Sequence, residues 1–253
     1  MYKVPFKGCK GFYSGVGSRE TPLHILYMMS KLAMIFEKKG YILRSGCAVG
    51  ADAAFEDILE NPHLSAEIYI PNVAFPLKMG TNMKNHYIVP KDNLGKDLYH
   101  EAMMLIHSKD IHKGWKYCKP YVMDLHNRNM FQVLGKDLIT RSKFTICYTK
   151  NGAKKYEDTD RSTGGTATAI NASDLHKVDV FNLGNEEDYK RLDKFIQDNE
   201  NLLDYGRLNN MVVRSDFNPD KLTYEELMPK MKLELINQKK KKKKNEIITK
   251  KVV

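Results

Sequence analysis

The 253-residue sequence predicts an α/β fold. Short apolar segments alternate with amphipathic segments of helical length from Gly11 to about Asn199, and two strand–glycine–helix units follow each other in residues 11–22 and 41–55. Strands that alternate with helices of this size form βαβ units, whose right-handed crossovers give a parallel sheet. We therefore expect a Rossmann-like three-layer domain with a mainly parallel sheet over residues 1–204.

The alternation places the elements of this domain along the chain. The predicted strands are Phe12–Val16, Tyr41–Arg44, Glu67–Ile70, Phe144–Tyr148 and Val178–Asn182. The predicted helices cover residues 23–38, 51–60, 121–139, Gly164–His176 and Glu186–Asn199. Thr21 and Pro22 stand where the N-cap and the first residue of helix 23–38 belong.

Residues 71–120 interrupt the alternation. They contain four prolines, mixed charges and a segment at Lys96–His107 that is typical of a helix. We interpret them as an insertion over the ligand face, which is either a lid or a structural excursion without a role in binding. Residues 205–237 follow the domain as a loosely patterned C-terminal extension.

The positive charge of the chain is concentrated at its C-terminus. The formal net charge is +10, but residues 230–253 carry ten lysines against Glu234 and Glu246, a balance of +8, so the preceding 229 residues carry only +2. The block Lys239–Lys244 repels itself, which predicts a disordered, lysine-rich tail over 238–253. Such a tail either contacts nucleic acid non-specifically or only aids solubility.

The cysteines and the hydropathy pattern indicate a soluble, cytoplasmic protein. Cys9, Cys47, Cys118 and Cys147 show no paired spacing, as expected for reduced thiols. The chain shows no secretory signal pattern, and no apolar run approaches the roughly 20 residues of a membrane span. We therefore expect no membrane partner.

Small residues gather in three loops, each of which follows a predicted strand. Because such loops leave a parallel sheet at one edge, their bare N–H groups and helix N-termini converge on a crevice suited to phosphate. Thr163 is the expected cap of the third helix. The first turn, GVGSRE, has Glu20 where a dinucleotide fingerprint has its third glycine, which disfavours NAD. The predicted binding residues in the loops are Gly15, Gly17, Ser18, Arg19, Ser45, Gly46, Gly50, Asp52, Thr163, Gly164, Gly165, Thr166 and Thr168.

Several segments resemble the DprA/Smf DNA-processing proteins and the wider superfamily that includes the LOG phosphoribohydrolases. GSRETP at 17–22 resembles the early GSR motif, and SGCAVGADAAFEDIL at 45–59 resembles the DprA segment SGxAxGxDxxAHxxAL. LHNRN at 125–129 resembles the Arg-Asn motif of DprA and the MHxRK motif of the LOG enzymes. STGGTATAIN at 162–171 resembles PGGxGTxxE of the LOG enzymes, and with VFNLG at 180–184 it also resembles the GALxTA and VFxxPG elements of DprA.

The resemblance covers roughly residues 11–185 and has functional implications. It implies a homodimer that binds a nucleotide or single-stranded DNA as a recombination mediator does, with Arg128 holding phosphate. The catalytic glutamate of the LOG enzymes falls on Asn171, and an amide cannot exchange a proton in acid–base catalysis. The resemblance therefore implies that phosphate binding remains while this route to glycosidic cleavage is absent.

Other carboxylates leave an enzymatic alternative open. Asp52 and Glu56 lie four residues apart at the start of the second helix, so they share one face near the crevice. Together with Glu20 on the first glycine turn, they are the catalytic candidates if the protein is an N-glycosidic-bond hydrolase or transferase that acts on nucleotides. Otherwise, Asp52 organises the turn and Glu56 is a solvated helix residue. A third alternative is a non-catalytic protein that sequesters a nucleotide signal in the same pocket.

No residue pattern specifies a metal or a cofactor. His100-Glu101 and His107 do not form an HExxH motif, because the second histidine lies seven rather than four residues after the first. His112, Trp115, Tyr117 and Cys118 are interpreted as a packed or exposed cluster in the insertion. A carboxylate pair can bind Mg²⁺ through water, but we expect no metal and no cofactor.

Overall fold

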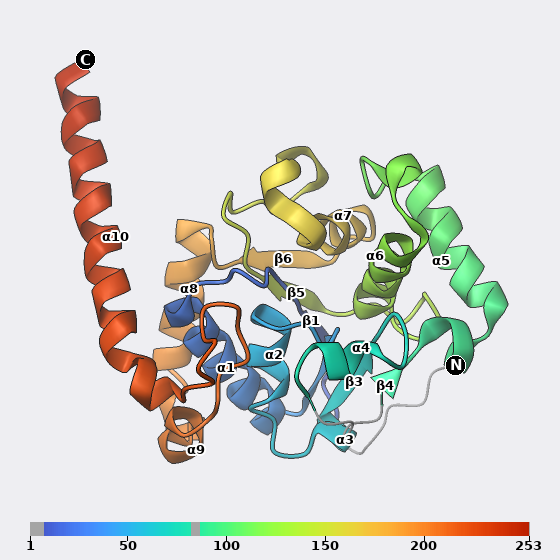
Figure 1. The fold of residues 1–253 in the computed structure, drawn as a ribbon, viewed down its shortest axis with the longest axis horizontal. Helices are drawn as coiled ribbons and strands as arrows, with labels where there is room; N and C mark the ends of the chain where they lie inside the picture. Colours follow the sequence, from blue (N-terminus) through green and yellow to red (C-terminus); the bar gives the residue numbers. More distant parts are fainter. Residues whose placement is uncertain (1–7, 82–86, 253) are drawn as a thin grey trace.

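The computed structural model describes residues 8–81 and 87–252, and within them the chain forms a parallel six-stranded sheet in the order β4-β3-β2-β1-β5-β6 (Figure 1). This arrangement confirms the predicted α/β class. The expected strands are present with boundaries shifted by a residue or two, and β4 was not predicted because it lies in the insertion. The strands are β1 Gly11–Gly15, β2 Tyr41–Ser45, β3 Ala66–Tyr69, β4 Tyr87–Ile88, β5 Phe144–Cys147 and β6 Asp179–Asn182.

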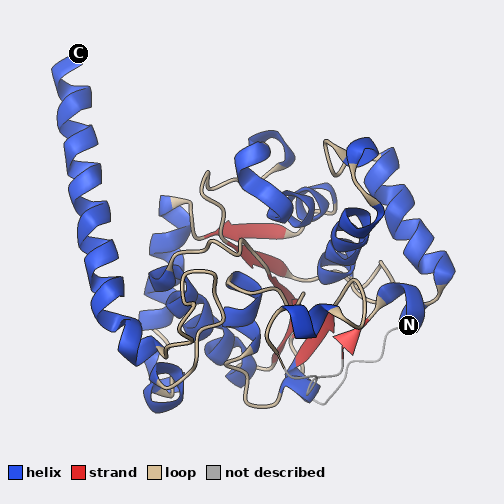
Figure 2. Ribbon diagram, viewed as in Figure 1, coloured by secondary structure: helices blue, strands red, loops and turns tan. Residues whose placement is uncertain are grey.

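Helices cover both faces of the sheet, so the molecule has three layers (Figure 2). One face carries α1 (Leu23–Lys38), α2 (Ala51–Glu56) and α8 (Glu186–Gln197). The other face carries α6 (Pro120–Leu134) and α7 (Ala167–Leu175), with α5 (Lys96–Ser108) packed on α6. The shorter α3 (Pro62–Ser65), α4 (Phe75–Lys78) and α9 (Tyr205–Asn209) lie in the connections. The layers are those of a Rossmann-like fold.

The larger hydrophobic core lies between α1 and the sheet. The ring of Tyr13 on β1 stands 5.0 Å from that of Phe36 on α1 and 5.8 Å from that of Phe144 on β5, measured between ring centroids. Burial of such rings contributes about 1.5–3 kcal/mol each. Tyr13, Phe36 and Phe144 thereby fix the central strands against α1, which holds the carboxyl end of β1 in place.

Several helix ends and caps differ from the sequence prediction, and the helix expected over 51–60 already ends at Glu56. The expected N-cap Thr21 makes no cap hydrogen bond to α1, because its Oγ1 donates instead to Ser18 O at 2.7 Å. The helix expected over 121–139 ends at Leu134, since Gly135 adopts φ +82° and closes it. The helix expected from Gly164 begins at Ala167, after a 3₁₀ turn over Arg161–Thr166.

The C-terminal segment differs most from expectation. α10 runs from Tyr224 to Val252 as one long helix that leaves the body of the protein (Figure 1), so the prediction of a disordered lysine tail is wrong in this structure. Lysine has a high helix propensity, and the segment contains neither glycine nor proline after Pro229. Within the lysine block, Lys242 Nζ lies 2.5 Å from Glu186 Oε2 at the start of α8. No helix in the described parts of the chain combines the length and apolarity that a membrane span needs.

The start of α10 belongs to the core rather than to a separate extension. Tyr224 and Leu227 are fully buried, and Met231 is nearly so. The hydroxyl groups of Tyr224 and Ser30 lie 3.0 Å apart, which links α10 to α1. The chain before α10 bonds back to the second glycine turn, since Gly50 N donates to Arg214 O at 2.7 Å.

Candidate functional site

A cavity of about 730 Å³ opens at the carboxyl ends of β1 and β5. From β1 the chain crosses to β2 on one side, and it later returns to pair β5 on the other side, so β1 and β5 flank the point where the strand order reverses. In open parallel sheets, ligands bind in the crevice outside this switch point. The volume is within the range of small-molecule and cofactor sites.

The cavity collects residues from the three predicted loops and from α6. The predicted residues that line it are Gly17, Ser18, Arg19, Asp52, Arg128, Thr163, Gly164, Gly165 and Thr166. The predicted residues outside its lining are Gly15, Ser45, Gly46, Gly50, Glu56 and Thr168. The convergence of the loops is thus present in the structure, whereas the role of each residue as a ligand stays a prediction.

Arg128 is the buried cation of this cavity. Its side chain is 9% exposed, and its Nη1 lies 3.2 Å from Asp52 Oδ2 on α2. With its amide oriented to suit the surrounding donors, Gln132 accepts a hydrogen bond of 2.8 Å from the same Nη1. Arg128 Nε has no hydrogen-bond partner among the described residues. A buried guanidinium with an unsatisfied donor is costly unless an anion completes its hydrogen bonds.

Asp52 is the carboxylate at the floor of the cavity. Burial raises its pKa above the ordinary value, while the neighbouring Arg128 and backbone donors oppose that rise. Ala48 N donates to Asp52 Oδ2 at 3.4 Å, so the same carboxyl group also ties down the second glycine turn. Asp52 therefore both organises the turn and orients Arg128.

The glycines of the first two turns are required for close packing. A Cβ on Gly17 would stand 2.6 Å from Ala51 Cβ, and one on Gly50, at φ +84°, would stand 2.7 Å from Ser18 O. A Cβ on Gly15 would collide with Phe55 in the core. These glycines allow the two turns and α2 to approach closely, and the expectation that their backbones also contact a phosphate stays a prediction.

The third loop is open to the cavity. Among the described residues, no atom lies within 4 Å of a Cβ built on Gly164 or Gly165. Asp160 caps the turn, because its Oδ1 accepts from Ser162 N at 2.8 Å, so the expected capping role of Thr163 is replaced by that of Asp160. Thr163 completes the capping box by accepting from Asp160 N at 3.0 Å.

Two residues of α7 have structural partners instead of a place in the lining. We expected the hydroxyl of Thr168 to bind phosphate, but its Oγ1 lies 2.8 Å from His126 Nδ1 and forms a hydrogen bond there. Asn171 is buried, and its Nδ2 donates to Ile111 O at 2.7 Å. Asn171 Oδ1 accepts from Thr159 Oγ1 at 3.2 Å. Asn171 therefore joins the insertion to the loop after β5 and lies outside the cavity lining.

Three charged groups that the sequence did not mark, Lys150, Arg161 and Asp216, also reach the cavity. The cations in its lining are Arg19, Arg128, Lys150 and Arg161, and the carboxylates are Glu20, Asp52 and Asp216. Gln132 was also missed, although it follows Arg128 by four residues, a spacing that puts both on one helix face. Asp216 gave no sequence signal, because only the fold of the C-terminal segment brings it to the site.

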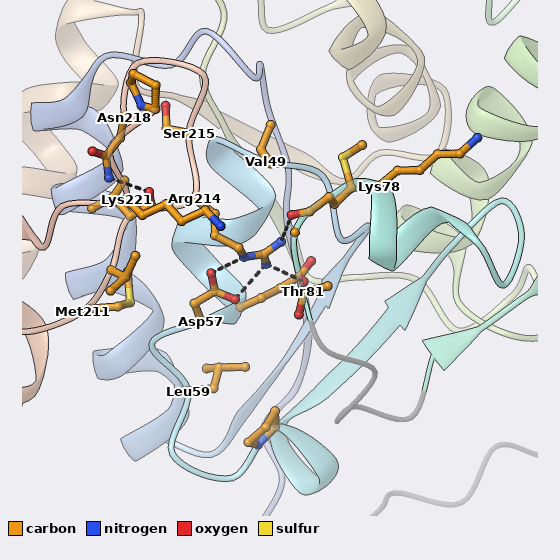
Figure 3. Close-up of a pocket in the computed structure, with 17 residues that line it drawn as sticks. Val49, Asp57, Leu59, Lys78, Thr81, Met211, Arg214, Ser215, Asn218 and Lys221 are labelled. Atoms are coloured by element: carbon orange, nitrogen blue, oxygen red, sulfur yellow. Dashed lines mark hydrogen bonds and ion pairs between the residues drawn. The ribbon is translucent and has the colours of Figure 1, made fainter.

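Glu56 lines a different cavity, of about 800 Å³, between α2 and the C-terminal segment (Figure 3). It is buried and accepts from Cys47 N at 2.7 Å, while burial and the neighbouring Asp52 raise its pKa to about 8. Arg214 spans this second cavity and binds Asp57 through Nε at 2.6 Å and Nη2 at 2.7 Å. The expectation that Asp52 and Glu56 face one crevice is therefore wrong, as is that of a solvated Glu56.

The insertion contributes no described residue to the lining of the first cavity. It supplies β4 at the edge of the sheet and α5 on the outer side of α6. The helix predicted at Lys96–His107 is confirmed as α5. The described part of the segment thus does not cover the first cavity as a lid would; residues 82–86 lie outside the described chain.

His112, Cys118 and His126 come together behind the cavity wall. One ligand atom from each residue lies within 4.8 Å of those of the other two. His126 itself lines the cavity, and burial together with nearby His112 and Arg128 lowers its pKa to about 3. All four cysteines of the chain are free thiols.

Comparison of the chain with protein-family models, with curated proteins and with solved structures finds no match. The resemblance to the DprA/Smf and LOG proteins therefore rests on the motifs of the sequence.

Proposed function

We propose that the protein binds a phosphate-bearing ligand of mononucleotide size in the cavity between β1 and β5. The observation that carries this proposal is Arg128, a buried guanidinium that lines the cavity and keeps an unpartnered Nε among the described residues. Arginine recognises phosphate through paired, charge-assisted hydrogen bonds. The bare backbone of Gly164 and Gly165 on the opposite loop allows close approach by the ligand.

A mononucleotide suits the cavity better than a long strand does. The lining holds four cations against three carboxylates, so the ligand would meet a small positive balance rather than a basic groove. Proteins that hold single strands use a charged groove with several stacking aromatic rings. Tyr148 is the aromatic residue other than His126 in this lining. Single-stranded DNA of the DprA type remains the alternative that the experiment must separate.

The test is calorimetric titration of the full chain with nucleoside monophosphates, inorganic phosphate and a short oligothymidine. Arg128→Lys keeps the charge beside Asp52 but loses the planar fork, so we expect about 10–100-fold weaker mononucleotide binding. Arg141→Lys, on the exposed surface and bonded to His176 O, is the matched control and should bind as the wild type does. Absence of binding by every phosphate compound, or equal binding by Arg128→Lys, would overturn the proposal.

A catalytic version of this function depends on Asp52, the buried carboxylate in the lining. A carboxylate at this position could act on the anomeric carbon of a bound nucleotide in N-glycosidic cleavage. Chromatography of the same nucleotide panel after incubation detects released base. Release that disappears in Asp52→Asn supports the hydrolase, and binding without release supports a receptor that does not turn over its ligand.

A further inference from the structure

We propose that His112, Cys118 and His126 form a zinc site at the wall of the cavity. Their ligand atoms all lie within 4.8 Å of one another, and the two imidazole rings have centroids 4.0 Å apart. Ligand atoms around a tetrahedral zinc ion stand about 3.3–3.8 Å apart, given bond lengths of 2.0–2.3 Å. Small side-chain rotations therefore close the site. The inference does not depend on the proposed nucleotide function.

The donor set selects the metal class. Two imidazoles and one thiolate are borderline-soft ligands that bind Zn²⁺ well and Mg²⁺ or Ca²⁺ poorly. The thiolate formed on binding offsets part of the ion charge beside Arg128. Three protein ligands leave a fourth position for water, as in catalytic rather than structural zinc sites.

The segment that carries His112 and Cys118 is held rigidly on both sides. Ile111 O accepts from Asn171 Nδ2 at 2.7 Å, and Lys113 Nζ donates to Thr159 O at 2.5 Å. Trp115, between the two ligands in sequence, is buried in the smaller core. Such support pre-organises a metal site, because the ligands lose little freedom when the ion binds.

His126 also has the outer hydrogen bond that zinc-binding histidines use. Thr168 Oγ1 lies 2.8 Å from Nδ1 of His126, which leaves Nε2 of the ring for the ion. His112 Nδ1 faces the cluster, because it lies 3.9 Å from Cys118 Sγ; the 3.2 Å hydrogen bond that Nδ1 accepts from Gly114 N is given up when its lone pair binds the ion. Thr168 is thus a positioning residue in this proposal, and its hydroxyl acts through His126.

The experiment measures metal binding by the full chain with any affinity tag removed. After chelation and dialysis, we expect the protein to take up one Zn²⁺ per chain in competition with a chromophoric chelator. Co²⁺ should give the visible spectrum of a tetrahedral site together with a thiolate charge-transfer band. Cys118→Ser should abolish that band, and Cys118→Ser and His112→Ala should each weaken Zn²⁺ binding by more than about 100-fold.

Controls separate the site from general histidine binding and from misfolding. His107→Ala, on the exposed side of α5, should bind Zn²⁺ as the wild type does. Thr168→Val should weaken binding by about 10–100-fold without removing a ligand. Thermal melts of the metal-free variants identify any that fail to fold. Unchanged binding in folded Cys118→Ser, or no Zn²⁺ uptake by the wild type, would each overturn the zinc assignment.

Discussion

The guanidinium of Arg128 occupies the space that a side chain on Gly46 would need. A Cβ built on Gly46 stands 1.1 Å from Arg128 Nη1, and Gln132 closes the same space from the next turn of α6. The glycine thus admits a long side chain from the opposite layer to the floor of the cavity. This contact links the second glycine turn to α6.

Gly46→Ala is therefore expected to displace Arg128 from Asp52. Forced movement of a buried, paired cation should destabilise the fold by on the order of 2–4 kcal/mol in urea denaturation and should abolish nucleotide binding. Gly165→Ala is the matched control for stability, because its Cβ meets no described atom within 4 Å. Equal stability of the two variants would contradict this account of Gly46.

Glu56 should make the stability of the protein fall as the pH rises. Its folded pKa of about 8 exceeds the ordinary value of 4.5. Between these values the unfolded chain releases the proton and the folded chain keeps it, so alkaline pH favours unfolding; below pH 4.5 both states hold the proton. Glu56→Gln removes this effect. From pH 5 to pH 9, the free energy of unfolding of Glu56→Gln should therefore rise by up to about 4 kcal/mol relative to that of the wild type.

The measurement is urea denaturation of the wild type and Glu56→Gln at both pH values. The amide can still accept the hydrogen bond from Cys47 N, so the contact itself is preserved. Glu101→Gln, on the exposed face of α5, should follow the wild-type profile. Parallel profiles for Glu56→Gln and the wild type would show that Glu56 is ionised in the fold at neutral pH.

Arg214 should hold the C-terminal segment against α2. Its two hydrogen bonds to Asp57 and one to Met79 O, at 3.1 Å, use the planar fork that lysine lacks. Arg214→Lys is expected to lower the free energy of unfolding by about 1–3 kcal/mol in urea denaturation. Arg141→Lys should change it by less than about 0.5 kcal/mol. A neutral Arg214→Lys would mean that backbone contacts such as Gly50 N to Arg214 O suffice.

Removal of the lysine block should weaken electrostatic binding of oligonucleotides and leave mononucleotide binding in the cavity unchanged. A chain ending at residue 238 keeps Met231, which is buried in the core, and Glu234, which pairs with His24. We expect its melting temperature and mononucleotide affinity to match those of the full chain. Binding of a single-stranded oligonucleotide should weaken, and its log–log salt slope should shrink by about 0.7 per lost phosphate contact. An unchanged slope would exclude the lysines from nucleic-acid contact.

The layers of the fold, and the edge of the sheet at which the cavity lies, follow from the sequence pattern alone. Apolar periodicity sets whether a segment is strand or helix, and parallel strands bring their following loops to one edge. Those local rules were sufficient to bring Arg19, Asp52 and the loop at Thr163–Thr166 into one lining. Arg128 came from motif resemblance, and the structure places it in the same lining.

Tertiary packing decided what each residue contacts. Gly46 and Gly15, which the sequence assigns to phosphate binding, make room for Arg128 and Phe55. The sequence does not reveal this role, because it does not show where two layers approach closely. Asp52 and Glu56, one helical turn apart, face different cavities since the C-terminal segment closes over one side of α2. His112 and Cys118 lie in the connection between α5 and α6, and they meet His126 of α6 without any motif spacing. Local sequence fixes backbone periodicity, whereas side-chain environments depend on contacts between residues far apart in the chain.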